Sequence, residues 1–120
     1  LVVRTLPNSK EKTEKVYSST NPPYLKTDAV EWMVEQGIEH LLLDVPSVDR
    51  EEDGGALAGH RAFWRYPENP RKSCTITEFI YAPDSVKDGL YLLNLQIAAF
   101  ENDAAPSRPV LYPVSNLIML

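Results

Sequence analysis

The most regular hydrophobic pattern in the chain lies between Thr27 and Gln36, where apolar residues recur on one face of a helix. The apolar stripe consists of Ala29, Val30, Met33 and Val34. Thr27 or Asp28 can serve as the N-cap, and Asp28 has capping-box spacing with Glu31. Gly37 follows directly and is a natural C-terminal stop. The pattern therefore predicts one well-defined helix from Thr27 to Gln36.

The other apolar runs are short and predict strands. Ile38 to Asp44 carries three consecutive leucines without alternation, which is typical of a strand covered on both faces. Leu1 to Thr5 is a second apolar strand, and three more are expected to follow one another as a meander. These three are Thr75 to Tyr81, Leu90 to Phe100 and Pro109 to Tyr112. Because a helix leads directly into a buried strand, we predict an α/β fold with few helices and a mixed, partly parallel sheet.

Polar segments separate these elements. Pro7 to Pro23 is a long polar loop, and a loop of this length in a compact domain is often functional. Pro46 to Gly55 is a turn-rich acidic loop, and Gly55 to Trp64 after it can form a short helix. Arg65 to Lys72 contains two prolines and is expected to be a loop. The apolar tail from Asn116 to Leu120 is expected to pack on the body of the protein or on a neighbouring chain.

Length and charge narrow the class of protein. The 120 residues suit a single domain with a real hydrophobic core. The chain carries 12 basic and 17 acidic residues, and its net charge of −5 argues against nucleic-acid or anionic-membrane partners. Its apolar runs are shorter than the roughly 18 residues of a transmembrane helix. We therefore expect neither nucleic acid nor a membrane among its partners.

The single cysteine and the first residues add two expectations. Cys74 is the one cysteine of the chain, so an internal disulfide and a CxxC metal site are both excluded. This cysteine usage is compatible with a reducing compartment, and we expect a cytoplasmic protein. The chain opens on LVVRT, an apolar strand without an initiator methionine or a signal peptide. We expect residues 1–120 to be a single domain segment of a longer protein.

The stretch TITEFIYA places a carboxylate where an apolar side chain is expected. If it forms one strand, Ile76, Glu78 and Ile80 share a face, because side chains alternate along a strand. A carboxylate on a buried face is costly unless it is paired, protonated or bound to a cation. Either Glu78 binds a cation, or this face is less buried and Glu78 pairs with an arginine such as Arg61 or Arg71.

His60 is the second candidate. If residues 56–64 are helical, His60 lies on the same face as Leu57, Phe63 and Trp64. A histidine on such a face is either a hydrogen-bonded core residue or a ligand. Imidazole and carboxylate are a common ligand pair for zinc or manganese, although two ligands are too few for a tight site. Further ligands would have to come from elsewhere.

Polar residues at the end of the leucine-rich strand are a third group. Asp44, Ser47 and Asp49 follow this strand, at the end where open α/β sheets place their sites. The alternative is ordinary turn chemistry beside a proline. His40 is expected to be a half-exposed strand residue. Arg4 can bind a substrate carboxylate or anchor a loop through a salt bridge.

Motifs of other mechanisms are missing from the sequence. The chain has no glycine-rich phosphate loop, no GxSxG and no HExxH. Cys74 with a distant histidine makes a weak case for a thiol nucleophile, and a buried or loop thiol is the simpler interpretation.

The order of several segments resembles the C-terminal half of the cyclase-like metal-dependent hydrolases, whose members include kynurenine formamidases and isatin hydrolases. The matching segments are LVVRT, HLLLDVPSVD, AGHRAFW, ITEFIY and LYLLNLQIAAF with PVLYP after it. The resemblance covers nearly the whole chain, and its most specific parts are the D-x-P-S-x-D turn, the histidine after it and the glutamate of ITEFIY.

The resemblance implies a fold, an activity and a ligand pair. The fold would be a swivelling β/β/α-type domain, incomplete in this chain, and the protein would form homo-oligomers or associate with the missing N-terminal segment. The activity would be hydrolysis of a small-molecule amide or cyclic amide by water that a divalent metal, zinc or manganese, activates, with a place in tryptophan catabolism. His60 and Glu78 fall on positions that are metal ligands in the family.

The chain departs from the family pattern in three ways. Phe79 and Ile80 stand where an Asn-Leu pair is usual, and the interval between His60 and Glu78 is longer than usual. The H-x-G-T-H-x-D-x-P stretch, which supplies the other ligands and the catalytic histidine, is missing, since His40 and His60 are the only histidines. Either that segment lies elsewhere, or the chain is a non-catalytic interaction or scaffold domain that keeps the fold.

Overall fold

The structure is a computed structural model that describes residues 1–114. The tail predicted to pack on the body or on a neighbouring chain lies outside these residues. The chain forms two compact units, the first Leu1–Asp84 and the second beginning at Ser85, and the single-domain organisation stays a prediction. Among the described residues, no helix is long and apolar enough to cross a membrane.

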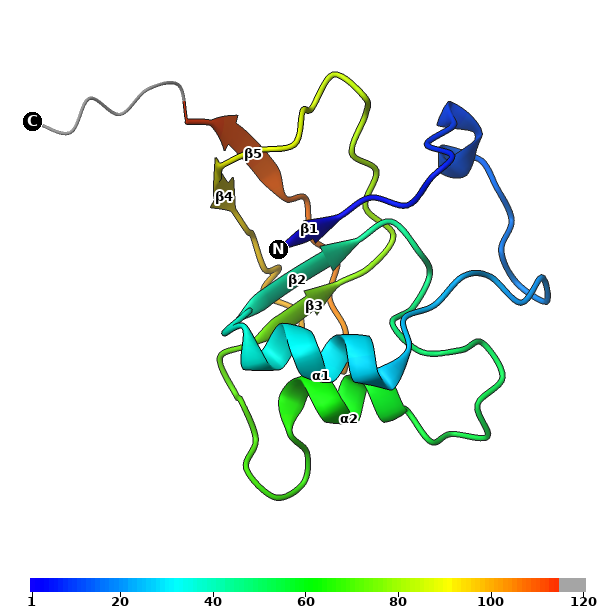
Figure 1. Cartoon of the computed structure of the whole chain (residues 1–120), viewed down its shortest axis with the longest axis vertical. Coiled ribbons are helices and arrows are strands. Elements are labelled where there is room, and N and C mark those ends of the chain that lie inside the picture. The colour runs from blue at the N-terminus through cyan, green and yellow to red at the C-terminus, as the bar shows by residue number, and fades with distance from the viewer. Residues whose placement is uncertain (115–120) are drawn as a thin grey trace, which may run out of the picture. The chain divides into compact units, whose positions relative to one another are not determined.

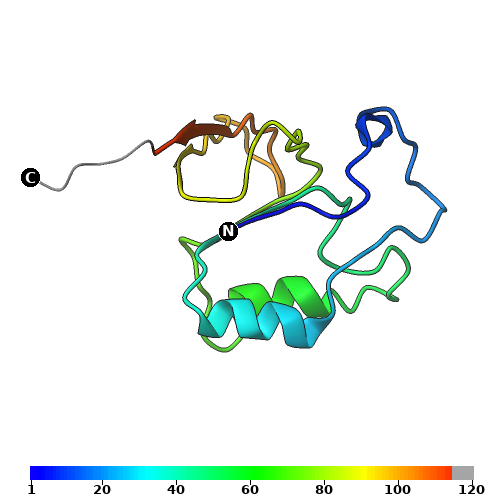
Figure 2. The same ribbon diagram turned by 45° about the horizontal axis from the view of Figure 1, so that its top comes forward.

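A small parallel sheet with two helices forms the first unit. The strands β1 (Val2–Val3), β2 (His40–Leu43) and β3 (Thr75–Thr77) lie in the order β1-β2-β3, and both pairs are parallel (Figure 1). The helices α1 (Thr27–Glu35) and α2 (Ala58–Trp64) lie side by side. Figure 2 shows both helices on one side of the sheet. This unit confirms the predicted parallel pairing.

Strand β2 is the centre of the core. Leu41 and Leu43 are fully buried and pack with the apolar stripe of α1 and with Phe63 of α2. The residues that α1 contributes are Val30, Met33 and Val34, as the sequence pattern predicts. Leu42 alternates to the opposite face and is buried too, which confirms a strand covered on both faces. Each such side chain stabilises the fold by roughly 1.5–3 kcal/mol relative to an exposed position.

The start of α1 corrects the capping prediction. Thr27 is the first helical residue, and the N-cap is Lys26, whose side chain makes no capping hydrogen bond. The carboxylate of Asp28 lies in the first turn and accepts from the N–H of Ala29 at 2.8 Å, where a negative charge favours the helix dipole. Gly37 ends the helix with a φ of +76°, as expected for a glycine stop.

Strand β3 is shorter than predicted. It ends at Thr77, because Phe79 adopts a φ of +59° that a pleated strand does not allow. The N–H of Phe79 still donates to the carbonyl of Val45 at 3.1 Å, so the chain stays beside the end of β2. The predicted alternation of Ile76, Glu78 and Ile80 on one strand face is therefore wrong. Glu78 lies just beyond the strand, where its side chain can turn back toward the loop after β2.

The described part of the second unit contains an antiparallel pair of strands. It consists of β4 (Tyr91–Asn94) and β5 (Val110–Pro113), paired so that Tyr91 lies opposite Pro113. The predicted meander of three strands is wrong, because β3 pairs with β2 in the parallel sheet. With two α-helices, a parallel sheet and an antiparallel pair among the described residues, the fold class is mixed α/β, as predicted.

The central position of β2 predicts a large cost for Leu41→Ala. Removing this fully buried side chain should lower the free energy of unfolding by about 2–5 kcal/mol. Leu6→Ala is the matched control, because Leu6 is 83% exposed and should change stability by less than about 0.5 kcal/mol. Urea titration followed by circular dichroism measures both. Equal losses in the two variants would contradict this description of the core.

Candidate functional site

The first turn of α2 is capped by a carboxylate that is distant in sequence. The N-cap residue Leu57 has a left-handed conformation, and its side chain makes no capping hydrogen bond. The N–H groups of Gly59 and His60 donate instead to Asp49, at 2.5 Å to Oδ1 and 3.2 Å to Oδ2. Asp49 thus satisfies two of the N–H groups that a helix start leaves without a partner. This contact fixes the start of α2 against the loop after β2.

Asp49 also contacts the imidazole ring of His60. Its Oδ2 lies 2.6 Å from Nδ1, and the residue is 8% exposed. The N–H of Asp49 donates to Ser47 Oγ at 3.1 Å, so its own backbone is held in a local turn. Gly59 permits the close approach of helix and loop, because a Cβ on Gly59 would lie 2.8 Å from Asp49 Oδ1.

Glu78 approaches the other side of the same ring. Its Oε1 accepts from the N–H of Val48 at 2.9 Å and lies 3.6 Å from Nε2 of His60. The side chains of His60 and Glu78 are 22% and 27% exposed, so the pair is partly buried but reachable from solvent. The ring of Trp64 packs beside the imidazole, with 5.3 Å between ring centroids. His60 is therefore flanked by one carboxylate at each nitrogen.

The structure thus brings together the two residues that the sequence and the family resemblance select. The alternative pairing of Glu78 with an arginine is not found among the described residues. Arg71 donates to the carbonyls of Phe63 and Ile38. Arg61 lies over the ring of Tyr66, with 5.4 Å from Cζ to the ring centroid.

Asp44 is an anchor for the N-terminal segment. It is 4% exposed, and both of its carboxylate oxygens accept from the N–H of Thr5 at 3.0 Å. The Nζ of Lys12 lies 2.8 Å from Oδ2 and forms a shielded ion pair with it. These contacts tie the chain after β1 to the end of β2, so Asp44 has a structural explanation.

The remaining candidates have ordinary contacts. Nδ1 of His40 lies 2.9 Å from Thr75 Oγ1 on the neighbouring strand. Arg4 donates to the carbonyl of Pro83 at 3.1 Å, which supports the loop-anchor interpretation. Cys74 is a buried free thiol whose carbonyl accepts from the Trp64 indole at 2.9 Å. None of these contacts brings them to His60 or Glu78.

The donor set of His60 and Glu78 fits part of a divalent metal site. Two ligands about 2.1 Å from a tetrahedral ion lie roughly 3.4 Å apart, close to the 3.6 Å between Nε2 and Oε1. In residues 1–114, no group of three or more histidine, cysteine, aspartate or glutamate side chains could hold a metal ion. The pair can therefore supply two ligands, and a complete site needs further donors.

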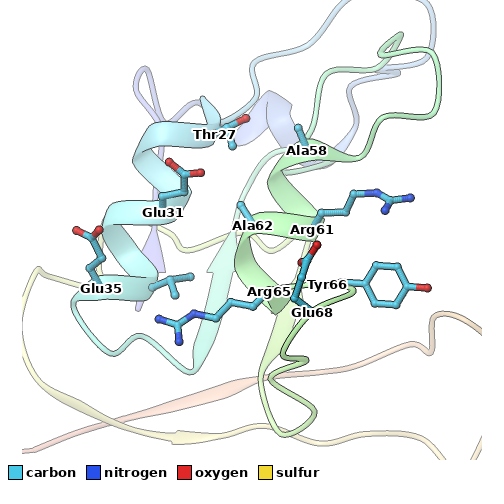
Figure 3. Close-up of a pocket in the computed structure, with 10 residues that line it drawn as sticks. Thr27, Glu31, Glu35, Ala58, Arg61, Ala62, Arg65, Tyr66 and Glu68 are labelled. Carbon is cyan, nitrogen blue, oxygen red and sulfur yellow. The ribbon is translucent and has the colours of Figure 1, made fainter.

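A separate groove lies between α1 and α2. It has a volume of about 490 Å³, and Figure 3 shows charged side chains along it. Glu31 and Glu35 come from α1, whereas Arg61 and Arg65 come from the end of α2 and the residue after it. His60 and Glu78 are not among the residues that line this groove, so it is distinct from the candidate site.

Sequence reasoning missed the partners that hold the two candidate ligands, His60 and Glu78. It treated Asp49 as a turn residue or a possible site residue, but not as the partner of His60. The available signal was Gly59, because a glycine inside a predicted helix often marks a close approach by another segment. The backbone N–H of Val48 carries no sequence signal.

Comparisons of the sequence with known proteins found one family model and several curated relatives. Residues 1–50 match a family model described as "Putative cyclase". A kynurenine formamidase from Bacillus anthracis is 34% identical over 93 residues, which cover 77% of this chain and 41% of that protein. Kynurenine formamidases from Bacillus cereus and Bacillus thuringiensis are 33% identical over the same shares. The chain thus spans about 41% of the length of these curated relatives.

The close approach at Gly59 predicts that Gly59→Ala lowers the stability of the fold, which is the opposite of its usual effect in a helix. In an exposed helix interior this change stabilises by up to about 1 kcal/mol, because alanine favours the helix. Here the new methyl group would press on Asp49 Oδ1 and on the Val48 carbonyl, so we expect a net loss of stability. Urea unfolding measures the change, and a variant more stable than the native chain would contradict the described contact.

Asp53 predicts a pH dependence at the same helix terminus. Its carboxylate accepts hydrogen bonds from the N–H groups of Leu57 and Gly55. These two hydrogen bonds, with the larger contribution from Leu57, hold the pKa of Asp53 below its ordinary value. Because the folded-state pKa is lower than the unfolded one, the stabilisation is complete above about pH 4 and disappears as the pH falls through the folded value.

Asp53→Asn should therefore be less stable than the native chain at pH 7, and the difference should shrink on acidification. Thermal unfolding midpoints between about pH 2 and pH 7 give this difference. Glu52→Gln, next to it in the same loop, is the control. A difference between native chain and Asp53→Asn that stays constant over this range would refute the role of the carboxylate.

Proposed function

Because the chain belongs to the cyclase-like family, we propose that it is the C-terminal portion of a metal-dependent amidohydrolase of the arylformamidase type. The observation that carries this proposal is the convergence of His60 Nε2 and Glu78 Oε1 at 3.6 Å. An imidazole and a carboxylate at this distance are suited to sharing one ion, zinc or manganese. The names of the curated relatives indicate a small amide substrate, and an aryl formamide is the first to test.

The residues of this chain would hold the ion and leave the proton transfers to other groups. A bound divalent ion would supply a water of lowered pKa and would polarise the amide carbonyl. The Nε2 lone pair of His60 and the carboxylate of Glu78 would be its ligands. The Val48 N–H restrains one oxygen of Glu78, so the carboxylate keeps its direction before any ion arrives. Partial burial lowers the local dielectric, which strengthens the interaction of both groups with a cation.

The remaining ligands and the catalytic acid or base would come from outside residues 1–114. Only two candidate ligands converge in the described part of the chain, whereas a catalytic zinc site uses three protein ligands. The relatives are more than twice as long as the matched segment, which leaves room for these groups in the corresponding polypeptide. We propose that they reach the site from an N-terminal segment or from a second copy of the protein.

A second candidate function is a non-catalytic interaction or scaffold domain. The specific observation in its favour is that both nitrogens of His60 already face carboxylates, at 2.6 Å and 3.6 Å. A protonated imidazole between Asp49 and Glu78 would form an ion-pair network that requires no metal. The two functions therefore differ in one property, which is whether the pair binds a divalent cation.

Metal binding separates the two. We expect the intact protein, with the segment that supplies the remaining ligands, to retain zinc or manganese after dialysis, and both His60→Gln and Glu78→Gln to weaken binding. The loss should exceed the roughly 10- to 100-fold effect that is typical of an outer-sphere partner. Metal content by elemental analysis, affinity by competition with a chelating dye and hydrolysis of an N-formyl arylamine measure the outcome.

The chain offers matched controls for both substitutions. His40→Gln changes the other histidine, which contacts Thr75, and Glu68→Gln changes an exposed glutamate of the loop before β3. Both controls should keep native metal content. If Glu78→Gln keeps full metal content and activity, the ligand assignment is wrong. If the intact protein binds neither ion, the scaffold function is the better description.

A further inference from the structure

The carboxylate of Asp49 determines which nitrogen of His60 can carry a proton. An ionised carboxylate only accepts hydrogen bonds, so the ring atom that faces it has to be a donor. Nδ1 lies 2.6 Å from Asp49 Oδ2, inside the hydrogen-bond range, whereas Nε2 lies 3.6 Å from Glu78 Oε1 and outside it. In a neutral imidazole the single proton therefore belongs on Nδ1, and Nε2 keeps its lone pair.

The position of Asp49 is fixed at several points. Its oxygens accept from the N–H groups of Gly59 and His60, and its own N–H donates to Ser47 Oγ. It is 8% exposed, and Gly59 leaves no side chain that could push the carboxylate aside. A carboxylate held in this way cannot rotate to follow the ring, so the ring has to adapt to the carboxylate.

The same turn holds the second ligand. Val48 donates its N–H to Glu78 Oε1, and its side chain is fully buried in the core. Two consecutive residues thus orient the two groups, one through a backbone donor and the other through a side-chain acceptor. The Nε2 lone pair and the Glu78 carboxylate then lie 3.6 Å apart, and a cation between them would offset the repulsion of the two acceptors.

We propose that Asp49 is the positioning residue of this site: it fixes the Nδ1–H tautomer of His60 and turns the Nε2 lone pair toward Glu78. The part of this proposal that concerns a metal ligand rests on the proposed function, whereas the tautomer does not. Carboxylates in this outer position hold metal-bound histidines in many proteins and raise their basicity. Asp49 touches neither the ion nor the substrate in this scheme.

The tautomer is measurable without metal or activity. Long-range proton–nitrogen NMR of the metal-free protein distinguishes Nδ1–H from Nε2–H. The spectra are recorded at a pH of about 9, which lies well above the ordinary pKa of an imidazole. The chain has two histidines, and the spectrum of His40→Gln assigns His60. We expect the Nδ1–H form of His60 to dominate in the native chain. A native spectrum with Nε2–H, or with both nitrogens protonated, overturns the proposal by itself.

Asp49→Ala tests whether Asp49 is the cause of the Nδ1–H tautomer. Without Asp49, Glu78 is the acceptor beside the ring, and the proton should move to Nε2. Zinc affinity should fall by about 10- to 100-fold, as for other outer-sphere partners. Asp53→Ala is the matched control, since it removes the acceptor of the Leu57 N–H at the same helix terminus without touching His60. It should leave the tautomer and the zinc affinity unchanged.

The possible results separate this proposal from the proposed function. A native Nδ1–H tautomer that persists in Asp49→Ala overturns the positioning role. A tautomer that shifts as expected in a protein without zinc or manganese binding supports the positioning of His60 and overturns the hydrolase function. If Asp49→Ala does not fold, the zinc affinity of Asp49→Asn is measured instead, because asparagine has the same shape as aspartate. Asp44→Asn, which changes another buried carboxylate, is the control. Equal affinities in these two variants count against the proposal.

Discussion

The loop after β2 decides where both candidate ligands lie, because two adjacent residues hold them by different hydrogen bonds. The Val48 N–H restrains Glu78 at 2.9 Å, and the Asp49 carboxylate binds the ring of His60 at 2.6 Å. The fully buried side chain of Val48 ties this turn to the core between β2 and the helices. Val48 thus links the packed core directly to the candidate site. A change in this turn would therefore displace the imidazole of His60 and the carboxylate of Glu78 at the same time.

The sequence predicted the parts of the fold whose cause is local. The apolar stripe of α1 and the leucines of β2 follow directly from side-chain periodicity. The end of β3 could not be predicted, because the left-handed conformation of Phe79 has no signal in a run of strand-forming residues. The helix begins at Thr27 as predicted, but its N-cap could not be predicted, because Lys26 takes that position without a side-chain hydrogen bond.

The site was predictable in composition but not in geometry. An out-of-place histidine and glutamate, with the family resemblance, selected His60 and Glu78, and the structure brings these two together. The reason for the meeting is tertiary. Asp49 reaches α2 across ten residues, and the Val48 backbone reaches Glu78 across 30. Contacts of this kind are invisible to periodicity, and Gly59 alone pointed to one of them.

The same arrangement also explains why one chain supports two functional interpretations. With a proton on each nitrogen of His60 the cluster would be an ion-pair network, and with a lone pair on Nε2 it would supply two ligands of the proposed metal site. The chain spans about 41% of the length of its curated relatives, so the completing donors would lie in another segment. The chemistry of the protein therefore depends on what lies between His60 and Glu78.

The most direct test of whether His60 and Glu78 share one ion is an anomalous difference map at the zinc absorption edge. The map is measured from crystals of the intact protein grown with zinc. We expect one peak within about 2.0–2.2 Å of both His60 Nε2 and a carboxylate oxygen of Glu78. A map without a peak at this position, or with zinc bound to only one of the two side chains, would contradict the shared site.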